Sequence, residues 1–270
     1  MTPPARAGPD ESWARNGLAG AVREVILCGV LGPMIDFYAR RRIVGREHLD
    51  HLDGPVLFVA NHSSHMDTPT VLRALPRAWR RRTAVAAAAD YFYQAPWLAR
   101  AVSLAFNTVP VQRKGGGVVP DAASHLAQLI DEKWSLLVFA EGTRSRDGNV
   151  GRLLSGAAVL AAQHGLAIVP VYVSGTHAVM PVGRSWMHRA PGRLLGRRQP
   201  IAIHFGPPVR PGDGEHRVDV MERVRTFFEA SGAVTPPDTR IVARRLRSRG
   251  KGLRHGWQRL HRRRDGRPAG

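Results

Sequence analysis

The chain reads VLFVANHSSHMD from Val56 to Asp67. The first five residues are apolar and include β-branched and aromatic side chains, which is typical of a strand that is buried on both faces. The polar residues that follow, with Ser63 or Ser64 as N-cap and Pro69 within the first turns, indicate the start of a helix. A strand that leads directly into a helix is the repeating unit of α/β sheets.

His62 and Asp67 lie five positions apart across this turn. On a regular helix five residues turn about 500°, which leaves the two side chains roughly 140° apart. They can meet only if His62 precedes the helix and Asp67 folds back toward it. The same spacing recurs at His48 and Asp53, but in a polar segment before the strand. We therefore interpret the first pair as a general base and its orienting carboxylate, with a solvated histidine in a polar turn as the alternative.

Strand-like and helix-like segments alternate along the rest of the chain. We expect further strands at 108–111, 136–140, 168–173 and 201–205, and helices at 120–133 and 155–164. This alternation predicts an α/β fold, with a single domain whose central sheet is mostly parallel and flanked by helices. A chain of 270 residues is long enough for one such domain with appendages.

An apolar segment precedes the first predicted strand. Residues 13–38 have a helical pattern, and the uninterrupted apolar run from Val25 to Ile35 covers 11 residues, short of the ~20 needed to cross a bilayer. Three arginines follow at 40–42. An apolar helix that ends in cations suits an element lying in the membrane interface, and a helix packed on the core is the alternative. We assign residues 1–40 to a loose N-terminus and this interfacial helix.

Charge is concentrated at the other end of the chain. The net charge is +19, and residues 240–270 hold 12 arginine or lysine side chains against one aspartate, a net +11. Such a segment suits anionic lipid headgroups or nucleic acid, and a disordered solubilising extension is the alternative. We assign residues 41–235 to the main domain and 236–270 to a basic, flexible tail.

The single cysteine, Cys28, excludes an intrachain disulfide and a cysteine-rich zinc site. Its apolar neighbours predict that it is buried.

Three further segments lie at the ends of predicted strands. They are FNTVPVQR at 106–113, LVFAEGTRS at 137–145 and IVPV at 168–171. A guanidinium fork fits a phosphate, so Arg113 and Arg144 near His62 would form a site for a phosphorylated alcohol, whereas a surface salt bridge is the alternative for each arginine. The glycines at 115–117 and in segment 141–145 do not have the spacing of a nucleotide-binding loop.

Together these blocks resemble the glycerolipid acyltransferase family, which includes 1-acyl-glycerol-3-phosphate acyltransferases. NHSSHMD at 61–67 matches the family's first block, Arg113 ends the second, EGTRS at 141–145 matches the third, and VPV at 169–171 resembles the fourth. The order and the intervals agree, and ordered co-occurrence of four blocks is far more specific than any one of them.

The resemblance implies transfer of a fatty acyl group from acyl-CoA or acyl-carrier protein to a hydroxyl of lysophosphatidate, in phospholipid synthesis, without a cofactor or a metal. His62 would remove the hydroxyl proton, and Asp67 would hold the imidazole in the productive tautomer. In the family, the second and third blocks serve the phosphate and glycerol of the acceptor. The corresponding residues here are Arg113, Glu141, Gly142, Thr143 and Arg144.

Four positions depart from the family's pattern. Asn107 and Gln112 stand where the second block usually has Gly and Asp, Ala140 stands where the third usually has Pro, and Leu154 stands where a downstream lysine is common. These changes bear on acceptor recognition and leave the catalytic pair intact. Another lysolipid, such as a lyso-ornithine lipid, is therefore the alternative acceptor.

A different class of function is a catalytically inert body whose basic tail binds membranes or nucleic acid. We favour the enzyme, because an inert body has no need of a histidine and an aspartate at a strand end. We expect an anionic membrane surface as partner, rather than nucleic acid, and a peripheral or monotopic location on the cytoplasmic face of the cell membrane.

Overall fold

A computed structural model describes residues 12–88, 96–111, 113–114, 117–118, 120–192 and 196–235. They belong to one compact unit that ends at Thr235. The tail predicted at 236–270 lies outside the described residues, and so does Gln112.

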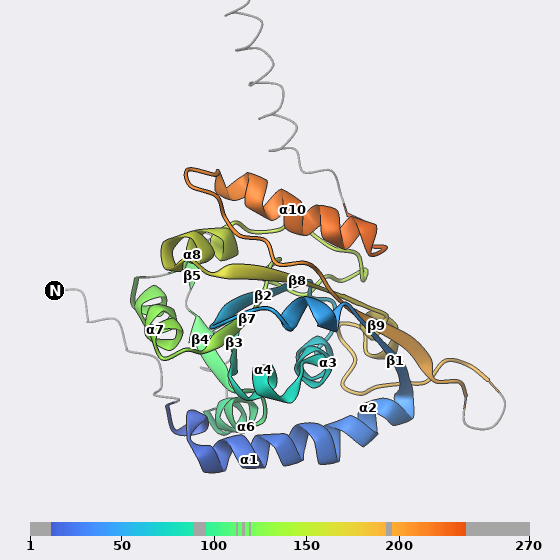
Figure 1. The fold of residues 1–270 in the computed structure, drawn as a ribbon. Helices are drawn as coiled ribbons and strands as arrows, with labels where there is room; N and C mark the ends of the chain where they lie inside the picture. Colours follow the sequence, from blue (N-terminus) through green and yellow to red (C-terminus); the bar gives the residue numbers. More distant parts are fainter. Residues whose placement is uncertain are drawn as a thin grey trace, which may run out of the picture. The chain divides into compact units, whose positions relative to one another are not determined.

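The centre of this unit is a seven-stranded sheet (Figure 1). Its strands are β1 (Ala39–Val44), β2 (Val56–Ala60), β3 (Thr83–Ala88), β4 (Thr108–Val111), β7 (Ser135–Phe139), β8 (Ala167–Ser174) and β9 (Gln199–Phe205). The strand order is β1-β9-β8-β2-β7-β3-β4, and every neighbouring pair is parallel except β8 and β9. The predicted α/β class with a mostly parallel sheet is confirmed.

Helices cover both faces of the sheet. On one face lie α7 (Pro120–Asp131), α8 (Gly156–His164) and α10 (Arg217–Ala230); on the other lie α3 (Asp67–Ala74), α4 (Arg77–Arg81) and α6 (Pro96–Phe106) (Figure 1). Shorter elements are η1 (Ser12–Arg15), η3 (Arg46–Leu49), α9 (Thr176–Val179) and the hairpin of β5 (Arg113–Lys114) and β6 (Gly117–Val118).

Strand β2 lies in the middle of the core. All five of its residues are at most 1% exposed. Leu57 and Val59 belong to the cluster that includes the buried side chains of α8 and α10, whereas Phe58 belongs to the cluster formed with α3. A strand buried on both faces is rigid, so it fixes the position of the residues that follow it.

The N-terminal helix is longer than its apolar run. The chain is helical from Gly17 to Tyr38, as α1 (Gly17–Glu24), the π-helical turn η2 (Val25–Leu31) and α2 (Gly32–Tyr38). These 22 residues are long and apolar enough, by length and composition, to cross a membrane. The sequence predicted a segment too short for this, because only the uninterrupted run was counted.

Two polar side chains, Arg23 and Glu24, fix this helix to the rest of the unit. Arg23 is 4% exposed and donates hydrogen bonds to the carbonyls of Leu104 (3.0 Å) and Ala14 (2.5 Å), and burial lowers its pKa to about 10. Glu24 accepts two hydrogen bonds from Arg80, at 2.8 and 2.9 Å. Helix α1 therefore packs along α6 (Figure 1).

One prediction for this region is wrong. Cys28 is exposed, because the helix lies on the surface and buries the neighbouring Leu27 instead. The arginines at 40–42 follow the helix in the edge strand β1, which pairs with β9, and Arg40 and Arg42 are exposed. Charged side chains are common on edge strands, where they discourage pairing with other chains. Arg41 is paired with Asp36 at 2.6 Å.

Asn107 has a backbone reason for replacing the family's glycine. Its φ is 54°, in the left-handed region that glycine adopts freely and asparagine tolerates better than most residues. The side chain is fully buried and donates a hydrogen bond to the Thr83 carbonyl at 3.2 Å. This departure from the family's pattern therefore preserves the turn between α6 and β4.

Candidate active site

Three neighbouring strands end at the same edge of the sheet. Strands β8, β2 and β7 are adjacent and parallel, so the residues after their carboxyl ends meet there. Asn61 and His62 follow β2, Glu141 follows β7, and Gly175 follows β8. The carboxyl edge of an open α/β sheet is where ligands usually bind.

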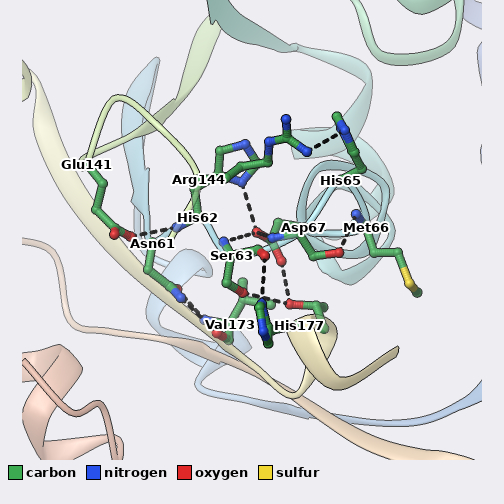
Figure 2. Close-up of polar contacts among 12 residues, drawn as sticks. Asn61, His62, Ser63, His65, Met66, Asp67, Glu141, Arg144, Val173 and His177 are labelled. Atoms are coloured by element: carbon green, nitrogen blue, oxygen red, sulfur yellow. Dashed lines mark hydrogen bonds and ion pairs between the residues drawn. The ribbon is translucent and has the colours of Figure 1, made fainter. Parts of the chain in front are cut away.

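His62 and Asp67 are in contact, as their order on the chain predicts. His62 Nδ1 lies 2.9 Å from Asp67 Oδ2; the histidine side chain is 18% exposed and the aspartate is completely buried. The same Oδ2 accepts hydrogen bonds from the backbone N–H groups of Ser63 (2.6 Å) and Ser64 (2.8 Å) (Figure 2). Three donors therefore converge on this one carboxylate oxygen.

The predicted N-cap is wrong. Helix α3 begins at Asp67, and Met66 is its N-cap without a side-chain hydrogen bond. Ser63 and Ser64 lie before the helix and donate their N–H groups to Asp67 instead of capping it. The aspartate therefore closes the turn that carries His62.

The surroundings of His62 select one tautomer of its ring. A carboxylate accepts hydrogen bonds only, so Nδ1 carries the proton and Nε2 is left as the basic nitrogen. The imidazole stacks on Phe139, the last residue of β7, with ring centroids 3.9 Å apart and an interplanar angle of 18°. The ring thus has both its tautomer and its plane fixed.

Glu141 holds the backbone around His62. Its carboxylate accepts hydrogen bonds from the His62 N–H at 2.8 Å and the Gly151 N–H at 2.7 Å. The side chain is 9% exposed, and this burial raises the pKa of its carboxyl, although both N–H donors oppose the effect. The carbonyl of His62 is held as well, because it accepts a hydrogen bond from the N–H of Ser145 at 2.8 Å. Segment 141–145 therefore positions His62 through the main chain.

The side chain of Asn61 connects the ends of β2 and β8 through hydrogen bonds. Its side chain accepts a hydrogen bond from the Val173 N–H at 2.7 Å and donates one to the Val173 carbonyl at 2.9 Å (Figure 2). It is 2% exposed. The amide thus continues the strand pairing one residue beyond the point where β2 ends.

Arg144 and His65 lie beside the histidine–aspartate pair. Arg144 Nη1 is 2.5 Å from His65 Nε2, and Figure 2 shows the guanidinium directed at the His65 ring. Partial burial and the Arg144 charge lower the pKa of His65. A neutral His65 can accept the hydrogen bond that the guanidinium donates. Thr143 is exposed next to Arg144, and Gly142 turns the chain with a φ of 72°.

The fold places the backbone of Arg113 farther from His62 than that of Arg144. It lies in β5, two positions after β4, and β3 separates β4 from β7 in the sheet. With strands roughly 4.8 Å apart, β4 is about 14 Å from β2. Its side chain lies outside the described part of the structure, so its predicted role stays a prediction.

Comparison with known proteins agrees with this arrangement. A family model described as Acyltransferase matches residues 40–174, half of the chain, and it includes all four motif blocks. The chain belongs to this acyltransferase family. The family predicted from the sequence is thereby confirmed.

The relatives of this chain carry the names of lipid enzymes. A chloroplastic 1-acyl-sn-glycerol-3-phosphate acyltransferase of Arabidopsis thaliana is 32% identical over 143 residues, which are 52% of this chain and 38% of that protein. A lyso-ornithine lipid O-acyltransferase of Pseudomonas aeruginosa is 27% identical over 202 residues, which are 70% and 73%. The chain spans under two fifths of the length of the Arabidopsis protein.

A solved structure shows the same fold. The 1-acyl-sn-glycerophosphate acyltransferase PlsC of Thermotoga maritima superposes with a TM-score of 0.56 at 23% identity, over 84% of this chain and 85% of that one. At this identity the likeness concerns the fold.

Sequence reasoning missed three residues of the site. The sequence predicts Phe139 only as part of a strand, and His65 only as a member of the first block. Thr176, whose hydroxyl donates to Asp67 Oδ1, lies beyond every motif and beyond the matched family range. The available signal was its place two residues after the carboxyl end of β8.

Proposed function

We propose that this acyltransferase moves a fatty acyl group from a thioester, acyl-CoA or acyl-carrier protein, to a hydroxyl of lysophosphatidate, with His62 as general base. The observation that carries the proposal is the 2.9 Å contact between His62 Nδ1 and the buried Asp67, at the carboxyl edge of the sheet. Family membership supports the reaction class.

The proposed reaction is a direct transfer. Nε2 of His62 takes the proton of the acceptor hydroxyl while the oxygen attacks the thioester carbonyl carbon. The tetrahedral intermediate collapses, the C–S bond breaks, and the departing sulfur takes the proton from the imidazolium. Asp67 stabilises the imidazolium between these two steps. The products are the ester and a free thiol, and His62 is neutral again.

Arg144 is the proposed ligand of the acceptor phosphate. In the free protein its guanidinium donates to a neutral imidazole, His65. A phosphate offers the same group a charge-assisted, bidentate partner, which is the stronger interaction. Phosphate binding near Arg144 would bring the glycerol hydroxyl of lysophosphatidate toward His62.

A lyso-ornithine lipid is the second candidate acceptor. The relative that bears this name aligns over 73% of its own length. Leu154 also lacks the charge of the lysine that is common at this position of the family. In a headgroup without phosphate, a single carboxylate would bind the guanidinium of Arg144.

An acceptor panel distinguishes these candidates. The wild-type protein is assayed with lysophosphatidate, lyso-ornithine lipid and monoacylglycerol, each with acyl-CoA and with acyl-carrier protein. Arg144→Lys keeps the charge and loses the fork, so KM for lysophosphatidate should rise roughly tenfold while KM for monoacylglycerol stays unchanged. Arg146→Lys, at an exposed arginine two positions on, is the matched control. Equal wild-type rates with phosphate and phosphate-free acceptors would exclude Arg144 as a phosphate ligand.

We further propose that the N-terminal helix lies in the membrane interface. Its outer side exposes Leu18 (76%), Val25 (65%) and Val30 (57%), and α6 adds Trp97 (73%). Exposed apolar side chains in this number suit contact with lipid. The contacts of Arg23 and Glu24 hold the helix along the domain, which supports an interfacial rather than a crossing position. The cytoplasmic leaflet is part of the same proposal.

Liposome binding tests this orientation. The double variant Leu18→Glu, Val25→Glu should lose most of its flotation with vesicles of anionic lipid, because two charges would enter the acyl region. Val234→Glu, at a valine that is 67% exposed outside this helix, should float like the wild type. Equal flotation of all three proteins would refute the proposed membrane surface.

A further inference from the structure

The carboxylate of Asp67 has a fourth hydrogen-bond partner. While Oδ2 accepts from His62, Ser63 and Ser64, Oδ1 accepts a hydrogen bond from the Thr176 hydroxyl at 2.5 Å. Both Asp67 and Thr176 are completely buried. The hydroxyl is therefore the donor that holds the oxygen turned away from the histidine.

The backbone delivers Thr176 to this position through a glycine turn. Gly175 follows the end of β8 and has a φ of 83°, and a Cβ at this residue would lie 2.1 Å from the Pro200 carbonyl oxygen. No other residue fits there without movement of β9. Thr176 then begins the short helix α9, so its position depends on the sheet and not on a free loop.

The surroundings orient the Thr176 hydroxyl. Its oxygen lies 3.2 Å from Ser63 Oγ, and that hydroxyl can donate to it. A hydroxyl has one proton to donate. Because the hydroxyl donates to the Asp67 oxygen at 2.5 Å, its proton points to Asp67 and its lone pairs remain for Ser63.

We propose that Thr176 is a positioning residue for acyl transfer, whose hydroxyl fixes the rotation of the Asp67 carboxylate so that Oδ2 stays directed at His62 Nδ1. This inference rests on the proposed function of His62 as general base. The torsion that turns an aspartate carboxylate has broad minima, so hydrogen bonds must select one orientation. Thr176 contacts Asp67 and has no part in binding substrate, so it acts on kcat and leaves KM unchanged.

Two variants of Thr176 each change one group of the side chain, the hydroxyl or the methyl. Thr176→Val keeps the shape and removes the donor, which leaves Oδ1 buried without its partner. It should lower kcat roughly 10- to 100-fold, with KM for donor and acceptor within about twofold of the wild type. Thr176→Ser keeps the hydroxyl and should restore kcat to within about threefold.

Thr70→Val is the matched control. Thr70 is also completely buried, it lies on α3 like Asp67, and its hydroxyl has no hydrogen-bond partner among the described residues. This variant makes the same chemical change without touching the carboxylate, so kcat should stay within about twofold of the wild type.

The outcomes separate this inference from the proposed function. Wild-type kcat in a folded Thr176→Val, while His62→Ala is inactive, would overturn the role of Thr176 and leave the general base intact. Equal loss in the Ser and Val variants would also overturn it, because the hydroxyl would then not matter. If Thr176→Val does not fold, Thr176→Ala is compared with Thr176→Ser by the same criterion. Full activity of His62→Ala would instead refute the proposed function itself.

Discussion

Replacing Glu141 with glutamine should separate stability from catalysis in this protein. The resemblance to the family implies that this residue serves the glycerol of the acceptor. In the structure both of its oxygens already accept backbone hydrogen bonds, from the N–H groups of His62 and Gly151. We therefore expect Glu141→Gln to lower kcat through the position of His62 and to leave KM for the acceptor unchanged.

The size of the effect on kcat follows from the number of acceptors. A glutamine side chain has one carbonyl oxygen, so one of the two N–H groups would face an NH₂ donor. A hydrogen bond to a charged group contributes about 1.5–3 kcal/mol, which corresponds to roughly 10- to 150-fold in rate if the bond is needed in the transition state.

Glu141→Gln should lower kcat but raise the stability of the folded protein at neutral and alkaline pH. Burial raises the pKa of the Glu141 carboxyl, so the folded protein binds this proton more tightly than the unfolded chain does. The contribution to stability is then complete below the unfolded value of 4.5 and is lost as the pH rises through the raised folded pKa. Glutamine resembles the protonated acid, so Glu141→Gln should match the wild type at acidic pH and be the more stable protein at pH 8.

Urea unfolding from pH 4 to pH 8 and steady-state acyl transfer are the two assays. Glu47→Gln, at an exposed glutamate on η3, is the control and should change neither result. A large increase in acceptor KM at constant kcat would refute the structural role, because Glu141 would then bind substrate. Wild-type stability that rises with pH relative to the variant would contradict the balance between burial and hydrogen bonding.

Two other contacts give sharp expectations. Phe139→Leu removes the ring that stacks on His62. Because aromatic pairs contribute about 0.5–1.5 kcal/mol, kcat should fall about 2- to 12-fold, while circular dichroism shows an intact fold. An unchanged kcat would show that the stacking does not position the imidazole. Arg23→Met leaves the carbonyls of Ala14 and Leu104 without their donor, so the urea midpoint should drop by an amount equivalent to about 2 kcal/mol, and proteolysis should cut the N-terminal helix first; wild-type resistance would show that Arg23 does not fix this helix.

The strands at the centre of the sheet could be predicted because their sequences are apolar and β-branched. Residues 56–60 and 168–173 are buried on both faces, so each forms a short, nearly continuous apolar run, which is typical of a parallel strand. Strand β3 was missed because TAVAAA is mostly alanine, which has a low strand propensity, and its place between β7 and β4 stabilises it. Strand β1 was missed because three of its six residues are arginine.

The contact between His62 and Asp67 could be predicted because its geometry is local. His62 and Asp67 are separated by one turn, and the strand and helix on either side leave them few arrangements. The contacts around the pair are not local. Phe139 ends β7, Glu141 follows β7 and Thr176 follows β8, and only the order of strands in the sheet brings them to His62 and Asp67. A single threonine after a strand carries no pattern that a sequence could reveal.

Turnover by His62→Ala tests the central claim most directly. Purified wild type, His62→Ala and His48→Gln are compared for transfer of a labelled acyl group from acyl-CoA to lysophosphatidate; His48 has the same spacing to an aspartate but bonds to the Phe205 carbonyl away from the sheet's carboxyl edge. A general base contributes about 100- to 10,000-fold, so His62→Ala should lose at least roughly 100-fold in kcat while His48→Gln retains wild-type turnover. Activity of a folded His62→Ala within about tenfold of the wild type would contradict acyl transfer by this histidine.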